Sequence, residues 1–445
     1  MTVFENVRVV SFEPPAVSEP MDVATAGPKT GSSPGAIVET GKGLAAKYPQ
    51  ARRVSGAYLS PGLVCAHTHL YSALARGLLT QIAPSKDFAQ QLRNLWWRLD
   101  RAIDLPILEA SALAGCAEAA ACGVTSVVDH HAGPEAIDGS LSVIRCAFDE
   151  IGLRGLVCYE TTDRNGPDGA RAGVHENLRF AREIDAERAA GKRPIVDGAI
   201  GAHAGFTLGD ETLAALGDAV RSSSRGLHTH AGEDKYDAVD SRYRYGMDLA
   251  ERLDAAGCLD AKTIVAHGLW LTESEVEILN ARGSFLAHNA RSNMNNAVGY
   301  NMLLPRYANV ALGTDGMSSD MLEEFRFAAF RHREAGGPWW PADFLRCLDR
   351  GNRIMERYMG VALGRVVAGA RADLVLWDYE PPTPLVGGNI AGHIAFGLSS
   401  RSVRSVMVDG NFVIEDRVPT FDAGAIAAKA REEARRLWDR MEERK

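Results

Sequence analysis

Short apolar runs recur along the chain from residue 60 onward, and each ends in a polar or ionisable residue before a helix-like stretch begins. The runs are continuously apolar, which is typical of strands that are buried on both faces of a parallel sheet. Helix-like segments such as 108–123 and 210–220 lie between them. The eight runs are residues 62–69, 125–131, 154–163, 196–203, 226–233, 262–268, 283–290 and 309–316. Eight strands alternating with helices over about 250 residues are typical of a (β/α)8 barrel.

The two flanks of this region have a different pattern. Residues 1–59 contain short strand-like pieces and turns, and the segments ARADLVLWDY, RSVMVDG and FVIEDR after the barrel alternate as strands again. We therefore predict an α/β fold in which a (β/α)8 TIM barrel, residues 60–366, is inserted in a small β-sandwich domain that both chain ends form, residues 1–59 and 367–422. Residues 423–445 are predicted to form a charged amphipathic helix. The segment GPKTGSSPG, residues 27–35, is expected to be a loop.

Composition narrows the class of protein. The chain has 445 residues, 46% hydrophobic and 24% charged, which is ordinary for a soluble globular protein. The net charge is -8, and the charged residues are spread along the whole chain without a basic stripe, so we expect no nucleic-acid partner. The seven cysteines are scattered and include no C-x-x-C, which favours a reducing cytoplasm. We also expect neither a signal peptide nor a membrane span, because the N-terminal segment has no apolar core and no uncharged apolar run reaches about 18 residues.

Histidines gather at one end of the predicted strands. Nine of the twelve lie at or near the C-terminal ends of the runs, where barrels place their active sites: His67, His69, His130, His131, His203, His228, His230, His267 and His288. Residues two apart on a strand point the same way, so His67 and His69 leave one face of the sheet together. On its own this pair fits a metal site or two satisfied core residues equally well, whereas core histidines have no reason to prefer one end of every strand.

The strand ends also supply carboxylates. His67, His69, His230 and Asp315 form a ligand set that suits Zn²⁺ or Fe²⁺, because neither thiolates nor an all-oxygen cage are present. Such a metal lowers the pKa of its bound water to about 7. Asp315 would take the proton of the water, Glu233 would carry it to the substrate, and His267 would hold the hydroxide or the developing oxyanion. The predicted reaction is hydrolytic attack on a trigonal carbon.

These residues carry a family resemblance over essentially the whole chain. The His67-x-His69 pair, His230-x-x-Glu233, VAHG around His267 and GTDG around Asp315 resemble the amidohydrolase superfamily, in its adenosine/cytosine deaminase-like branch with a single metal. The segments AGARADLVLWD and PGLVCAHTHLYSALARG resemble its C-terminal and first-strand signatures. At DHHA, NLWWRLD, HNARSNMNN, GTDGMSSDM and NIAGHIAFG, the chain is similar to the SsnA group of aminohydrolases.

The resemblance implies the same roles for the residues above and adds His203 as a substrate contact. No lysine ends the fourth run, where binuclear members carry a bridging carboxylated lysine, so the resemblance implies one metal ion, Zn²⁺ or Fe²⁺. A homodimer is expected by analogy with the family.

Further residues are candidates for substrate binding, each with a structural alternative. Trp96 and Trp97 lie on a predicted helix after the first strand; because neighbours cannot share one helix face, we expect one in the core and one, Trp96, at the pocket. Arg291 and Asn293 lie in a loop near the barrel mouth, where an Arg can bind a carboxylate or ring oxygen or be purely structural. Weaker candidates are Glu160, Asp163 and Arg164 after the third run, and His130, His131 and His228, for which core and supporting roles both remain open.

The predicted protein is thus a cytoplasmic, metal-dependent hydrolase that attacks a C–N bond of a small nitrogen heterocycle with metal-bound hydroxide and releases ammonia. Hydrolytic opening of a cyclic amide or ureide ring is the alternative, because the same residues would serve it. Dechlorination of a heteroaromatic ring is a third possible reaction. A non-enzymatic function, as a metal-binding or scaffolding barrel, is the alternative to an enzyme.

Overall fold

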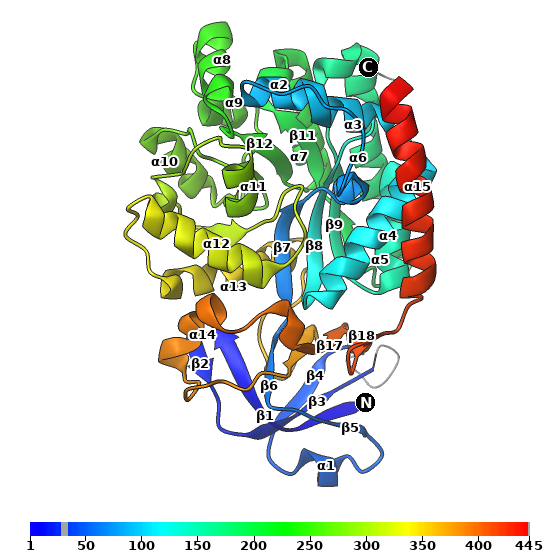
Figure 1. The fold of residues 1–445 in the computed structure, drawn as a ribbon, viewed down its shortest axis with the longest axis vertical. Coiled ribbons are helices and arrows are strands. Elements are labelled where there is room, and N and C mark those ends of the chain that lie inside the picture. Colours follow the sequence, from blue (N-terminus) through cyan, green and yellow to red (C-terminus); the bar gives the residue numbers. More distant parts are fainter. Residues whose placement is uncertain (28–33, 444–445) are drawn as a thin grey trace.

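The computed structural model describes residues 1–27 and 34–443 (Figure 1). All eight apolar runs form strands, and the fourth is divided into two at Ala199. They are β7 (Leu63–Thr68), β8 (Val124–His131), β9 (Arg154–Tyr159), β10 (Val196–Gly198), β11 (Ile200–Ala204), β12 (Leu227–Ala231), β13 (Ile264–His267), β14 (Phe285–His288) and β15 (Val310–Leu312). Every pairing between them is parallel, which confirms the predicted strands and a mixed α/β fold.

These strands form two parallel sheets that follow the order of the chain. One has the order β10-β9-β8-β7 and the other β11-β12-β13-β14-β15. Single parallel bridges link them at both ends, from Thr161 to Ala202 and from Thr68 to Asp315. The second bridge places the end of the first strand beside the end of the last one, although almost 250 residues separate them.

Helices follow the strands and cover the sheets. The predicted segment 210–220 lies within α7, and the predicted segment 108–123 extends two residues past the end of α4 at Ala121. Asp104 begins α4 by accepting a hydrogen bond from the backbone N–H of Ile107, which satisfies one of the free donors of the first turn. The helices are α4 (Leu105–Ala121), α5 (Ser140–Ile151), α6 (Gly166–Ala189), α7 (Asp210–Ser223), α8 (Lys235–Tyr245), α9 (Leu249–Ala255), α10 (Glu273–Arg282), α11 (Ala290–Asn295), α12 (Met321–Glu334) and α13 (Pro341–Met359).

Both flanks of the chain build one ten-stranded sheet, seen below the helices in Figure 1. Its main path is β19-β18-β17-β16-β6-β1-β3-β4, and β2 and β5 also pair with β1. The first six strands are β1 (Thr2–Phe12), β2 (Pro15–Val17), β3 (Met21–Thr25), β4 (Ile37–Gly41), β5 (Arg52–Ser55) and β6 (Tyr58–Pro61). The others are β16 (Leu374–Trp377), β17 (Val403–Val408), β18 (Asn411–Glu415) and β19 (Val418–Pro419). A separate apolar cluster around Phe4, Leu59 and Leu374 lies against this sheet.

Short elements complete the chain. They are α1 (Leu44–Lys47), the 3-10 turns at Leu70–Ala75, Asp163–Asn165, Gly205–Thr207, Leu304–Arg306, Gly387–Asn389 and Ser400–Ser402, and α14 (Ile390–Phe396). The predicted C-terminal helix is α15 (Ala423–Glu443), which runs beside α4 and α5 in Figure 1 and is tied to α4 by the Lys429–Glu109 ion pair. Residues 444–445 of that prediction, and 28–33 of the predicted loop, lie outside the described residues. In the part of the chain that is described, no helix is both long and apolar enough to span a bilayer.

Candidate active site

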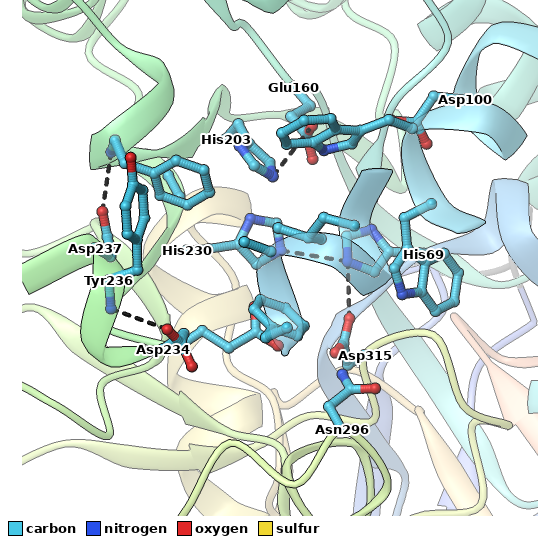
Figure 2. A pocket seen from close by; sticks show the side chains of 18 of the residues that line it. His69, Asp100, Glu160, His203, His230, Asp234, Tyr236, Asp237, Asn296 and Asp315 are labelled. Carbon is cyan, nitrogen blue, oxygen red and sulfur yellow. Dashed lines mark hydrogen bonds and ion pairs between the residues drawn. The ribbon is translucent and has the colours of Figure 1, made fainter. Parts of the chain in front are cut away.

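The C-terminal ends of the parallel strands surround a cavity (Figure 2). His69, His230, Glu233 and Asp315 line its floor. The segment after β7 forms an aromatic wall through α2 (Phe88–Gln91), a π-helical stretch at Leu92–Trp96 and α3 (Trp97–Ala102). This is the end of the strands at which the sequence places the chemistry.

Imidazoles and one carboxylate meet at the floor of the cavity. The Nε2 atom of His69 lies 2.8 Å from Oδ1 of Asp315 and 3.3 Å from Nε2 of His230. His67 Nε2 lies 3.6 Å from the same Asp315 oxygen, and His267 Nε2 lies 3.9 Å from Asp315 Oδ2. Ligand atoms of His67, His230, His267 and Asp315 all lie within 4.8 Å of one another.

Hydrogen bonds on the outer side of the rings orient them toward this point. Nδ1 of His69 donates to the carbonyl oxygen of His130 (2.6 Å), and Nδ1 of His267 faces Oδ1 of Asn293 (2.8 Å). In both rings the proton on Nδ1 leaves Nε2 free to act as a ligand or an acceptor. His67 is held from behind by Nε2 of His228, 2.9 Å from its Nδ1.

The donor set fits a divalent transition metal. The Nε2 atoms of His67 and His267 are buried and have no hydrogen-bond partner, which is costly unless something else engages them. Neutral imidazoles with one carboxylate are ligands that Zn²⁺ and Fe²⁺ prefer. Burial alone would raise the pKa of Asp315, but the neighbouring imidazoles of His67 and His69 hold it well below its ordinary value, so this carboxylate is ionised.

Backbone strain marks two of these positions. His267 and Asp315 have φ angles of 74° and 52°, in the left-handed region that residues other than glycine rarely adopt. Such strain persists only where the surrounding structure imposes it, and it is common at functional sites. His267 is the last residue of β13 and Asp315 follows β15 by three residues, and these positions bring Nε2 of His267 to 3.9 Å from Oδ2 of Asp315.

Glu233 lies beside the cluster rather than in it. Its Oε2 atom is 3.5 Å from Nε2 of His267. Burial, together with the negative charge of Asp315, raises the pKa of Glu233 well above its ordinary value. A carboxyl group with a raised pKa can hold a proton and then release it to a substrate.

Two of the predicted substrate contacts, His203 and Trp96, line the cavity. Trp97, which was expected to pack in the core, lines it as well. His203 and Trp96 are at the wall as expected, with Nδ1 of His203 2.9 Å from the hydroxyl of Thr207. Trp97 also lines the cavity, so the expectation that only one tryptophan would do so is wrong. The assumption of regular α-helix fails here, because residues 92–96 form a wider π-helical turn immediately before Trp97.

Arg291 and Asn293 do not line the cavity. The guanidinium of Arg291 is buried and paired with Glu323 and Glu324 on α12, with the Arg291 Nε–Glu324 distance at 2.6 Å. Arg291 is therefore held by protein carboxylates and does not face the cavity in which the sequence predicted it to contact substrate. Asn293 supports His267 from outside, as described above.

The roles of His130, His131 and His228 were left undecided by the sequence, and the three side chains have different surroundings in the structure. His228 supports His67, and Nε2 of His130 lies 3.0 Å from the carbonyl oxygen of Ala202. Both ring nitrogens of His131 are buried without a hydrogen-bond partner, and this side chain does not line the cavity.

Sequence reasoning missed several side chains at the site. The hydroxyl of Ser292 donates to Oδ2 of Asp315 (2.5 Å), and Asn296 lines the cavity and donates to the Ser292 hydroxyl (3.3 Å). Both belong to the motif HNARSNMNN, in which position alone gave no reason to prefer them over Arg291. Asp100 was missed altogether, and Glu160 was ranked among the weak candidates, yet both line the cavity.

Comparisons with known proteins agree with this geometry. The model of the amidohydrolase family matches residues 58–413. A 5-methylthioadenosine/S-adenosylhomocysteine deaminase of Haloarcula marismortui is 30% identical over 395 residues, covering 85% of this chain and 87% of that protein. A 5'-deoxyadenosine deaminase of Methanosarcina mazei is 28% identical, with 87% and 88% covered.

Solved structures are similar over nearly the whole chain. An adenosine deaminase from Xanthomonas campestris with bound zinc superposes with a TM-score of 0.80 at 25% identity, covering 98% of each chain. The atrazine chlorohydrolase TrzN from Arthrobacter aurescens, complexed with zinc, has a TM-score of 0.78 at 22% identity, covering 98% of this chain and 100% of that one. The second likeness concerns the fold alone.

Proposed function

The chain belongs to the amidohydrolase family, and from this membership we propose that it deaminates the adenine ring of an adenosine derivative. It is a metal-dependent hydrolase that acts on a C–N bond, other than a peptide bond, of a small nitrogen heterocycle. The choice of adenine is supported by the named activities of the two relatives and of the zinc-bound adenosine deaminase. Aromatic side chains on the cavity wall offer a planar ring flat surfaces to stack on.

One observation carries the proposal. Three kinds of group lie together at one end of the cavity. They are the buried Nε2 atoms of His67 and His267, which have no hydrogen-bond partner, the ionised carboxylate of Asp315, and the carboxyl group of Glu233, whose pKa is raised. Separately, each is found in many proteins, but together they provide a metal site, a base and an acid within reach of one substrate atom.

We propose that His67, His69, His230 and Asp315 hold the metal ion. Zn²⁺ is favoured by the similar adenosine deaminase, which has bound zinc, with Fe²⁺ as the alternative. When bound, such an ion activates water as a nucleophile near neutral pH.

The chain's own residues then handle the protons. Asp315 accepts a proton from the attacking water as oxygen bonds to the amino-bearing ring carbon. Glu233 delivers a proton to the neighbouring ring nitrogen, and Nε2 of His267, held by Asn293, accepts a hydrogen bond from the attacking oxygen. The proton that Asp315 took from water then passes to the amino group, which leaves as ammonia. The hydroxyl on the ring carbon returns its proton to Glu233 as the carbonyl forms, so one water is consumed and both carboxyl groups regain their starting states.

For the architecture, we propose that residues 60–366 form a (β/α)8 barrel. The two bridges between the parallel sheets support a closed ring of strands. Residues 1–59 and 367–422 would be the small β-sandwich domain, and α15 a surface helix packed on the barrel. A cytoplasmic location is supported by the free thiols of all seven cysteines. The homodimer stays a prediction.

The test is mass spectrometry of products after the metal-loaded enzyme is incubated with adenosine, 5'-deoxyadenosine, 5-methylthioadenosine, aminopyrimidines and hydantoins. Ammonia release with replacement of NH by O in the adenosine compounds is the expected result. Addition of a whole water without ammonia, in a hydantoin only, would overturn the proposal in favour of ring opening.

A further inference from the structure

Asn296 contacts both carboxyl groups that the proposed mechanism uses for proton transfer, one directly and one through a hydroxyl. It follows α11 and lines the cavity with Asp315 (Figure 2). Nδ2 of Asn296 donates to the hydroxyl of Ser292 (3.3 Å), and that hydroxyl donates to Oδ2 of Asp315 (2.5 Å). Burial raises the pKa of Glu233, and a hydrogen bond from the side-chain amide of Asn296 partly offsets this rise.

The direction of these hydrogen bonds is fixed by Asp315. As a carboxylate it can only accept, so the single hydroxyl proton of Ser292 must point to it. The oxygen of Ser292 is then left as an acceptor, and Asn296 must present its NH2 group to it. An Asn296 side chain flipped by 180° would instead bring its carbonyl oxygen to a hydroxyl that has no proton left to donate.

Gln91 holds the Asn296 amide in this orientation. It is the last residue of α2, in the wall segment after β7, and its Nε2 donates to Oδ1 of Asn296 (2.9 Å). This contact is partly buried and has the usual length of an N–H···O hydrogen bond. Asn295 adds a longer, solvent-exposed contact to the same oxygen (3.4 Å). Donors therefore face the oxygen of the amide, and acceptors face its nitrogen.

Gln91 itself lies outside the cavity. Phe88, Ala89 and Leu92 of the same segment line the cavity, whereas Gln91 does not. A change at Gln91 can therefore reach the proton-transfer groups through Asn296 without removing a substrate contact. This separates an effect on positioning from an effect on substrate binding.

We propose that Asn296 is a positioning residue for both proton-transfer groups and that Gln91 sets the orientation of its amide. The two N–H bonds of one NH2 group serve Glu233 and Ser292, so a single side chain holds the acid and, through Ser292, the base in one arrangement. The assignment rests on the proposed function, because it explains how the acid and the base of that reaction are kept in place together. Its consequence is that the wall segment controls kcat through a residue that does not touch the substrate.

The first experiment measures kcat and KM for the adenosine compound with the highest kcat/KM. Gln91→Glu keeps the shape of the side chain but replaces the donor with an acceptor, so the Asn296 amide should flip. We expect kcat to fall at least about tenfold with KM changed less than about twofold, because the reacting groups are displaced and the substrate contacts remain. The matched control Gln90→Glu, on the same helix and also outside the cavity, should leave both unchanged. An unchanged kcat in Gln91→Glu, or a loss confined to KM, would overturn the assignment.

A double variant tests whether Gln91 acts through Asn296. Asn296→Leu removes the amide and should lower kcat at least as much as Gln91→Glu. Adding Gln91→Glu to Asn296→Leu should then cause no further loss, because the contact between the two side chains is already gone. Losses that multiply in the double variant would show that Gln91 acts by another route and would refute its assigned role.

A measurement without turnover keeps this proposal separate from the proposed function. In infrared spectra of the metal-loaded enzyme, the carbonyl band of the protonated Glu233 carboxyl group is identified by its loss in Glu233→Gln. Asn296→Leu should move this band to higher frequency, because the carboxyl group loses a hydrogen bond, and Gln90→Glu should leave it in place. An unmoved band in Asn296→Leu would overturn the assignment. If no adenosine compound releases ammonia, the proposed function fails, and the infrared comparison still decides whether Asn296 holds Glu233.

Discussion

Asp373 connects the ten-stranded sheet to the parallel strands, and its loss should weaken the whole protein. It precedes β16, and its carboxylate binds Arg154 at the start of β9 through two hydrogen bonds of 2.8 and 2.9 Å. The two side chains are 2% and 3% exposed, so little water is available to replace either partner. Asp373 also accepts a hydrogen bond from the backbone N–H of Asp409 (2.8 Å).

Asp373→Asn removes the charge but keeps an oxygen for the Asp409 N–H. Leaving one member of a buried ion pair without its partner costs about 3–5 kcal/mol. Because Asp409 still lies 3.4 Å from Arg154, we expect the lower end, about 3 kcal/mol of the free energy of unfolding. Urea unfolding followed by tryptophan fluorescence measures this loss.

The matched control is Asp254→Asn, which breaks the more exposed pair with Arg282. That pair is bidentate as well, but the side chains are 27% and 53% exposed, and we expect less than about 1 kcal/mol. If Asp373→Asn were as mild as Asp254→Asn, Asp409 would compensate Arg154 completely, and the reasoning from burial would be refuted.

Three further predictions concern the site. Glu233→Gln should lower kcat by at least about 100-fold with metal content unchanged, because the amide cannot carry the proton; wild-type ammonia release would rule out Glu233 as the shuttle. Asp315→Asn should lose activity and bind less metal, measured by ammonia assay and elemental analysis, and a fully active, metal-bound variant would contradict its role as base. In Gly313→Ala, the new Cβ would lie 2.8 Å from Cβ of His67 and displace that ring, so metal affinity should fall about 10-fold or more. The control Gly388→Ala has no atom within 4 Å of its new Cβ and should leave metal affinity unchanged. Equal metal affinities in the two variants would contradict the steric argument.

The parallel strands could be predicted because burial on both faces leaves a continuous apolar run. The candidate metal ligands could be selected because each stands at the end of such a run, and parallel strands bring those ends together. The structure brings ligand atoms of His67, His230, His267 and Asp315 within 4.8 Å of one another and places Nε2 of His69 2.8 Å from Asp315.

Contacts between distant segments could not be predicted. Arg291 near the barrel mouth was as good a candidate for substrate binding as any arginine, and only the packing of α12 shows that Glu323 and Glu324 engage it. Trp97 was misplaced because a single π-helical turn alters the direction of every side chain that follows. Asp100 is paired with Arg164, about 60 residues along the chain, so no local pattern could reveal that it lines the cavity.

The pairing of β6 with β16 also has a consequence for how the protein is made. The two strands are about 300 residues apart, so at roughly 5–20 residues per second the ribosome needs about 15–60 s to supply the partner of β6. Throughout that interval the edge of β6 is exposed and can pair with a strand of another nascent chain. Slowing translation between residues 61 and 374 should therefore increase aggregation more than the same delay placed after residue 419, when every strand of the sheet has been synthesised.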